Sequence, residues 1–359
     1  NEDQWRAFYN RFAIKEGGNA HSDPHQEFLG KNILFAIQSP KDVSQKINKP
    51  LDETHDLLKQ AQDKLFSRRN DRVHPHLDDK VIVDWNGLMI ASLAYGSRVL
   101  QEKDYLVAAE EAAQFIINNL INEDGRLYHR YREGDVAVLA SIEDYAFLID
   151  GLIELYQASF KEEYLKRAIE LSHHMVDLFW DETSGGFYFT GDDAQELLFR
   201  QKEVYDGAIP SGNSMAAFNL IRLYHMTFDK QWESYVDQLL RHFASQIHRA
   251  PNAYTQLLAA YQFALGPSAE IVISAHRHDK MVAHYAQEMT KTFLPFSVVL
   301  FRPADNTQEM ISMASYLKEQ KPIDDKATVY LCEKHVCKLP VNNIEQLKKL
   351  LITLTRRPE

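Results

Sequence analysis

The chain has 359 residues, of which 45% are hydrophobic and 25% charged, and a formal net charge of −11 at pH 7. This balance is typical of a folded, soluble protein, and the interleaving of acidic and basic residues excludes the basic stripe that nucleic-acid binding requires. No apolar run reaches the roughly 18 residues of a membrane span, and the polar start has no signal-peptide character. We therefore expect a cytoplasmic protein that binds no membrane.

In chain order, the predicted elements are two helical segments, residues 3–12 and 52–69, and then three helical hairpins. The hairpins pair residues 87–100 with 104–120, 145–160 with 163–179, and 214–226 with 231–244. The first helix of each pair is apolar nearly all round, whereas the second carries a polar stripe that includes Glu110, Glu111 and Arg167. We therefore expect buried inner helices covered by amphipathic outer ones.

Inner and outer helices of this kind predict an all-α fold, the (α/α)6 barrel or toroid, for which a solenoid of stacked hairpins is the rival architecture. The predicted inner ring is completed by residues 3–12, 252–265 and 307–317, and the outer ring by 52–69, 278–292 and 343–354. Residues 1–359 would then form one domain.

Short strands are expected at two places around this ring. Residues 126–139 and 186–200 each hold a Gly-Asp turn between β-prone stretches, which predicts hairpins at the rim. Residues 270–274, 296–301 and 327–332 are β-prone and alternate with helical patterns. They predict a small α/β elaboration within residues 268–340.

The chain has two cysteines, Cys332 and Cys337, which are too few for a disulfide scaffold and favour a reducing compartment. Together with His335 they would lack an evident fourth ligand for zinc, so no metal is expected. The motifs HExxH, GKS/T and GxGxxG are absent, so no other cofactor is expected either. Without a Cys-x-x-Cys motif, this chain is predicted not to exchange disulfides.

Four long motifs carry a resemblance: LDDKVIVDWNGLMIA from Leu77, IEDYAFLIDGLIELY from Ile142, GGFYFT from Gly185, and KEVYDGAIPSGNSMAAFNLIRL from Lys202. With these motifs the chain resembles the YyaL-like, spermatogenesis-associated family. In that family a thioredoxin-like domain precedes an α/α barrel of the six-hairpin glycosidase type. The resemblance implies the barrel fold and an association with a thioredoxin-like domain, and its link to glycosidases and sugar epimerases is an analogy of fold.

Three of these motifs lie where a predicted inner helix begins. Because all inner helices of a closed ring run the same way, their first residues would meet at one mouth and line a single cavity. Carboxylates and amides bind sugar hydroxyls, and aromatic rings cover the apolar face of a sugar. The predicted catalytic residues are Glu143, Asp206, Asp79 and His76. The predicted substrate-binding residues are Asp78, Lys80, Trp85, Asn86, Asp144, Tyr145, Glu203, Tyr205 and Asn213.

The same residues have structural interpretations that stay open. Asp84, Asp144, Ser211 and Asn213 suit helix caps, the acidic residues suit ion pairs, and Trp85 and Tyr145 suit the core. Two functions are therefore carried forward. One is an enzyme that processes a carbohydrate, either a glycoside hydrolase or a sugar epimerase, with Glu143 or Asp206 as the acid. The other is a non-catalytic sugar-binding or scaffold module that serves a thioredoxin-like domain.

Overall fold

The computed structural model describes residues 1–194, 198–333 and 336–355. The chain forms two compact units, Asn1–Asp78 and Asp79–Glu359, called unit 1 and unit 2 here, and each is described by itself. That residues 1–359 form one domain stays a prediction. Among the described residues, no helix combines the length and the apolar character that a membrane span requires.

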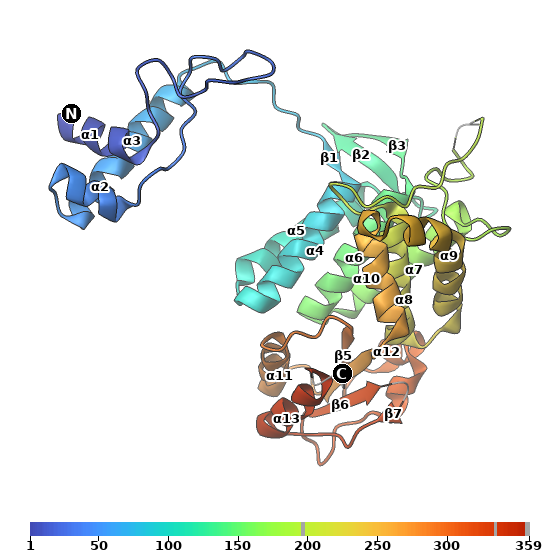
Figure 1. The fold of residues 1–359 in the computed structure, drawn as a ribbon. Coiled ribbons are helices and arrows are strands. Elements are labelled where there is room, and N and C mark those ends of the chain that lie inside the picture. The colour runs from blue at the N-terminus through green and yellow to red at the C-terminus, as the bar shows by residue number, and fades with distance from the viewer. Residues whose placement is uncertain (195–197, 334–335, 356–359) are drawn as a thin grey trace. The chain divides into compact units, whose positions relative to one another are not determined.

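Unit 1 holds helices α1 (Glu2–Arg11), α2 (Pro40–Ile47) and α3 (Leu51–Asn70) (Figure 1). Helix α1 begins with a capping box, in which the Asn1 side chain accepts the Gln4 N–H at 2.8 Å. A small apolar core joins the three helices through Ala7, Val43, Ile47, Leu57 and Leu58. The helices predicted at residues 3–12 and 52–69 are therefore confirmed, and their place in a ring stays a prediction.

Unit 2 is built on the predicted helical hairpins (Figure 1). The pairs are α4 (Val83–Leu100) with α5 (Lys103–Asn119), α6 (Ile142–Ser159) with α7 (Glu162–Phe179), and α8 (Gly212–Thr227) with α9 (Lys230–Arg249), followed by α10 (Thr255–Leu265). Helices α4, α6, α8 and α10 lie side by side in that order. Each of the first three also packs against its own hairpin partner. The predicted inner and outer helices, and with them the α/α barrel class, are confirmed.

Burial follows the predicted division. On α6, Phe147, Ile149 and Leu152 are fully buried although they point in different directions around the helix. On α9, by contrast, the buried residues form one stripe, which includes Trp232 and Leu239. Burying one such side chain contributes about 1.5–3 kcal/mol, so the inner layer dominates the stability of unit 2. Glu110, Glu111 and Arg167 all stay out of the core, as predicted.

Glycine sets the close approach of α4 and α6. A Cβ atom placed on Gly87 would lie 2.5 Å from the backbone carbon of Phe147 on α6. A Cβ on Gly151 would lie 2.9 Å from the carbonyl oxygen of Gly87. The two helix backbones therefore touch where the glycines face each other, which fixes how the starts of α4 and α6 meet.

A three-stranded antiparallel sheet, β1 (Val81–Ile82), β2 (Tyr128–Arg132) and β3 (Asp135–Leu139), lies at the end where the inner helices begin (Figure 1). It confirms the first predicted rim hairpin. The second, over residues 186–200, is wrong for the described residues, which form turns and an isolated bridge between Trp180 and Phe187. Residues 195–197 of that segment lie outside the described part.

The C-terminal part of unit 2 is the predicted α/β elaboration. Strand β4 (Ala269–Ala275) pairs in parallel with β5 (Ser297–Pro303) and antiparallel with β6 (Thr328–Glu333), which pairs with β7 (Val336–Cys337). Cys332 and Cys337 form a disulfide across β6 and β7. His335 of the rejected zinc site lies outside the described residues.

Two helices predicted for the outer ring belong to this sheet instead. Helices α11 (Lys280–Thr290) and α13 (Ile344–Thr355) share an apolar core with the strands through residues such as Tyr285, Leu347 and Ile271. Their apolar stripes are covered by a sheet face, which amphipathic periodicity alone cannot distinguish from a ring of helices. The predicted inner helix at 307–317 is also wrong, since it forms the six-residue α12 (Gln308–Met313) and a short 3-10 helix (Ser315–Glu319).

Candidate functional site

Carboxylates gather where α4 and α6 begin, beside the rim sheet. Asp144, the third residue of α6, is fully buried, and its Oδ2 accepts hydrogen bonds from the Ser141 N–H at 2.8 Å and Oγ at 3.1 Å. The cap predicted for Asp144 is therefore present. Its other oxygen, Oδ1, accepts the Asp84 N–H at 3.1 Å and lies 2.8 Å from Nδ1 of His129.

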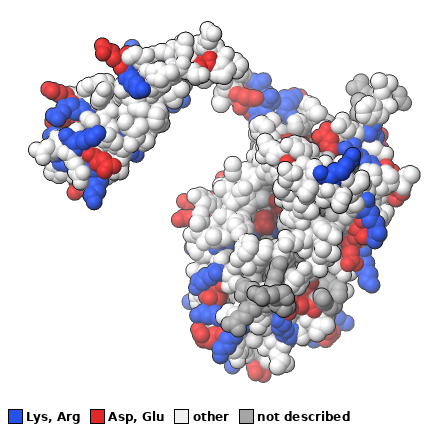
Figure 2. All heavy atoms as spheres, in the orientation of Figure 1, with Lys and Arg blue, Asp and Glu red and all other residues white. Residues whose placement is uncertain are grey.

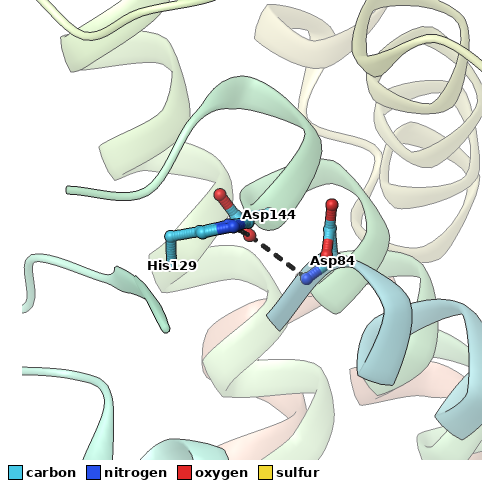
Figure 3. A group of neighbouring side chains, drawn as sticks. All are labelled: Asp84, His129 and Asp144. Carbon is cyan, nitrogen blue, oxygen red and sulfur yellow. Dashed lines mark hydrogen bonds and ion pairs between the residues drawn. The ribbon is translucent and has the colours of Figure 1, made fainter. Parts of the chain in front are cut away.

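His129 comes from strand β2 and points at Asp144, which lies in turn beside Asp84 at the start of α4 (Figure 3). The hydrogen bond to the Asp144 carboxylate raises the pKa of His129, partly opposed by burial. This pairing resembles a His-Asp dyad, in which the carboxylate fixes the tautomer and orientation of the imidazole. Sequence reasoning missed His129, although it lies within the predicted rim hairpin.

Asp84 itself is 8% exposed, and one of its carboxylate oxygens accepts the Trp85 N–H at 2.6 Å. Burial, and then the negative charge of Asp144, raise the pKa of Asp84. The hydrogen bond from the Trp85 N–H and the nearby His129 act in the opposite direction. Asp84 is thus a carboxyl group whose affinity for a proton is increased by burial and by a neighbour of the same charge.

Glu143 stands next to this group and is the most perturbed carboxyl at the mouth. Burial raises its pKa to about 7, with further contributions from the charges of Asp84, Glu203 and Asp144. A hydrogen bond from the Gly212 N–H, at the start of α8, acts in the opposite direction. Glu143 is partly exposed, so a proton on it is both retained near neutral pH and accessible from solvent.

Asp206, the other predicted acid, is used as a cap. Its Oδ2 accepts the N–H groups of Gln256 at 2.8 Å and Leu257 at 3.2 Å in the first turn of α10, and its Oδ1 accepts the Ser211 N–H at 3.0 Å. Both carboxylate oxygens of Asp206 are thus occupied by backbone N–H groups, and the side chain holds the start of α10 to the loop before α8.

Two predicted substrate-binding residues lie in the core, and their prediction is corrected. Tyr145 is fully buried, and its hydroxyl accepts the Leu127 N–H at 3.1 Å. Asn213 is also fully buried, and its amide donates to the carbonyls of Phe187 and Glu203, both at 2.8 Å. Both side chains connect neighbouring loops through hydrogen bonds and do not face a ligand.

The remaining predicted residues are distributed around the mouth or away from it. Asp79 forms an ion pair with Arg132 Nε at 2.7 Å, and Asn86 donates to the Ile82 carbonyl at 2.8 Å. Trp85 and Tyr205 are 63% and 67% exposed, so both present aromatic surface to solvent, contrary to a core role for Trp85. Exposed positions are also taken by Lys80 and Glu203 in unit 2 and by His76 and Asp78 in unit 1.

Asp84, His129 and Asp144 offer ligand atoms that all lie within 4.8 Å of one another, the one such group found in the described part of the chain. One Asp144 oxygen already accepts the backbone N–H of Asp84 and lies 2.8 Å from His129 Nδ1. The bond between His129 and Asp144 places an imidazole and two carboxyl groups where a proton can pass between them.

Inner helices, outer helices and a rim sheet with a carboxyl-rich mouth define a helical barrel protein with a candidate acid–base site. The chain is 30% identical to human spermatogenesis-associated protein 20 over 352 residues, which cover 95% of this chain and 45% of that protein. An uncharacterised protein of Caenorhabditis elegans is 28% identical over 94% of this chain and 47% of its own length. The chain is thus similar to spermatogenesis-associated protein 20 over nearly its whole length, as its motifs predict, and it spans about half the length of these relatives.

Solved structures with similarity to the chain include two sugar-processing enzymes. The GH76 α-mannanase of Bacteroides thetaiotaomicron has a TM-score of 0.42 and 16% identity, over 60% of this chain and 63% of its own. Cellobiose 2-epimerase of Bacillus thermoamylovorans has a TM-score of 0.44 and 14% identity, over 74% of this chain and 67% of its own. No family model matches the chain.

Proposed function

We propose that unit 2 processes a carbohydrate by acid–base catalysis at the mouth formed by α4, α6 and the rim sheet, with Glu143 as the general acid. The single observation that carries this proposal is the pKa of Glu143, which burial and three neighbouring carboxyl groups raise to about 7. A carboxyl with a pKa near the working pH both holds a proton and releases it readily. Of the predicted catalytic residues, Glu143 is kept.

In this proposal Asp84 and His129 replace Asp206 and Asp79 among the predicted catalytic residues. Asp206 is bound by three backbone N–H groups and Asp79 by Arg132. The charges of Asp84 and Asp144, by contrast, act on Glu143, and His129 contacts Asp144. In a hydrolase, Glu143 protonates the leaving oxygen while ionised Asp84 activates water or stabilises the sugar cation. In an epimerase, neutral His129 removes a proton beside a carbonyl and Glu143 supplies one.

The carbohydrate class rests on the surroundings of Glu143. Trp85 directly follows Asp84, and Tyr205 follows Glu203 by two residues, so two exposed aromatic rings stand in the same segments as the carboxyl groups. Aromatic faces and carboxylates are the usual partners of the apolar and hydroxyl-bearing sides of a sugar. The resemblance to six-hairpin glycosidase barrels agrees with this class of substrate.

The proposal is tested by incubating the protein with a panel of oligosaccharides and separating released reducing sugars, which mark a hydrolase, from isomerised products, which mark an epimerase. Glu143→Gln should lower turnover by about 100-fold or more, since general-acid catalysis contributes that much. Glu163→Gln, an exposed carboxyl on outer helix α7, is the matched control and should change nothing. Equal turnover by the Glu143→Gln variant would refute the proposed acid.

A non-catalytic sugar-binding module, serving a thioredoxin-like domain, is the second candidate. It is favoured by the structural use of Asp206, Asn213 and the capping oxygen of Asp144. A thermal-shift screen with the same sugars separates the candidates, because binding stabilises the folded state by mass action whether or not chemistry follows. If sugars stabilise the wild-type protein but no product forms at any pH, the result would support the non-catalytic sugar-binding module.

A further inference from the structure

A cavity lies in unit 2, towards the opposite end of the inner helices from Glu143. Its volume is about 820 Å3, within the range of small-molecule sites. On α6 it is lined by Glu154 and Gln157, and Glu154 lies roughly 16 Å along the helix axis from Glu143. None of the residues predicted for the sugar site lines it. This cavity is therefore a separate site.

One side of the cavity is charged. Glu154 binds Arg98 of α4 through one carboxylate oxygen and Arg222 of α8 through the other, and Arg222 also binds Asp150 at 2.8 Å. Arg222 is only 3% exposed. Figure 2 shows a hollow in unit 2 with acidic and basic atoms at its bottom and uncharged residues around it.

The arginine at this side has unused hydrogen-bonding capacity. Arg98 donates to Glu154 through Nη2, but its Nε is buried and has no acceptor in the described part of the chain. Buried polar groups are normally satisfied, so this N–H marks a position where an acceptor is missing. A carboxylate can accept two parallel N–H groups from one guanidinium, and such pairs are among the stronger hydrogen bonds.

Part of the lining is apolar. Helix α11 contributes Val282, Ala283 and Ala286. The inner helices contribute the rings of Phe263 and of Phe218, which lies beside Arg222. These side chains suit an aliphatic or aromatic body that leaves water on binding.

Most of the basic side chains that line the cavity are already paired. Arg98 and Arg222 bind Glu154, Arg277 binds Glu162, and Lys291 binds Glu288. Lys103, at the start of α5, also lines the cavity and has no ion-pair partner among the described residues. Such a cation favours an anionic ligand over a cationic one.

We propose that this cavity binds an amphipathic organic anion, a carboxylate with an apolar body, whose carboxylate lies at Arg98 and Lys103 and whose body packs against α11. The ion pairs of Glu154 keep the two arginines in place before the ligand arrives. The lining holds both charged and apolar side chains, which accounts for both parts of such a molecule.

Isothermal titration calorimetry with sodium decanoate tests the proposal. One decanoate should bind per chain, and decanol, which lacks the charge, should bind at least tenfold more weakly. Ala283→Trp places a ring in the cavity from the exposed side of α11 and should weaken decanoate binding at least tenfold. His284→Trp, at an exposed neighbouring position outside the cavity, is the matched control and should bind like the wild type.

Charge is tested separately with Lys103→Gln, which should weaken decanoate binding several-fold and reduce its salt dependence. The Glu143→Gln variant should bind decanoate normally, which separates this cavity from the proposed sugar site. The proposal is overturned if decanoate does not bind, if decanol binds equally well, or if Ala283→Trp binds decanoate like the wild type.

Discussion

Two groups of carboxyls lie along helix α6, and they differ in what surrounds them. Glu143, at the start of the helix, has Asp84, Asp144 and Glu203 as its charged neighbours. Glu154, almost three turns further on, is held by Arg98 and Arg222. Both are withdrawn from solvent, yet burial and like charges raise the pKa of Glu143 to about 7, whereas the two arginines lower the pKa of Glu154 despite its burial.

The two groups of carboxyls on α6 therefore have different roles, since one stabilises the fold and the other is available for chemistry. Towards the far end of α6 from Glu143, arginines compensate the carboxylates and join α4, α6 and α8. At the mouth, Glu143 and Asp84 have no ion pair with a lysine or arginine among the described residues, which costs stability and leaves a proton available. Groups that destabilise the fold in this way are typical of functional sites.

The largest expected effect comes from removing Arg222, which compensates the charges of Asp150 and Glu154. Arg222→Met leaves Asp150 and Glu154 buried with only Arg98 beside them. We expect a loss of about 3–5 kcal/mol in the free energy of unfolding, measured by urea denaturation, because an uncompensated buried charge is expensive. Arg241→Ala, which breaks an exposed pair with Asp237, is the control and should cost below about 1 kcal/mol. Similar losses for both variants would remove the distinction between the two groups.

Sequence reasoning predicted only some of the residues on which this comparison depends. Hydrophobic periodicity predicted α4 to α9 closely, because inner and outer helices differ in how far apolar residues extend around them. It placed Glu143 at a helix start, but it could not show that Asp206 caps α10, since the N–H groups that donate to Asp206 lie 50 and 51 residues further along the chain. His129 was missed for the same reason, because its contact with Asp144 depends on how the rim sheet folds over α6.

The second-largest effect is expected for Glu143, whose contribution to the free energy of unfolding depends on pH. Its raised pKa means that the folded state holds a proton that the unfolded chain has already lost, so stability falls as the pH rises from about 4.5 to 7. Glu143→Gln should therefore be more stable than the wild type at pH 8, by about 2 kcal/mol after allowance for solvent screening. The gain should vanish near pH 4. A variant less stable than the wild type at pH 8 would contradict the assigned environment.

A smaller effect is expected at the dyad. The Asp144 carboxylate raises the pKa of His129, so Asp144→Asn should lower that pKa. The titration of the His129 ring protons, followed by NMR, measures it directly. The amide can still accept the N–H of Ser141, so the helix start should persist. An unchanged His129 titration would show that Asp144 does not act on the imidazole.

The central claim is that the mouth keeps a proton on Glu143 near neutral pH. It is tested most directly by NMR titration of the side-chain carboxyl carbon in protein labelled at glutamate, with the signal of Glu143 assigned by its absence from Glu143→Gln. The account predicts a midpoint near pH 7. A midpoint near 4.5, the ordinary value for a glutamate, would contradict it.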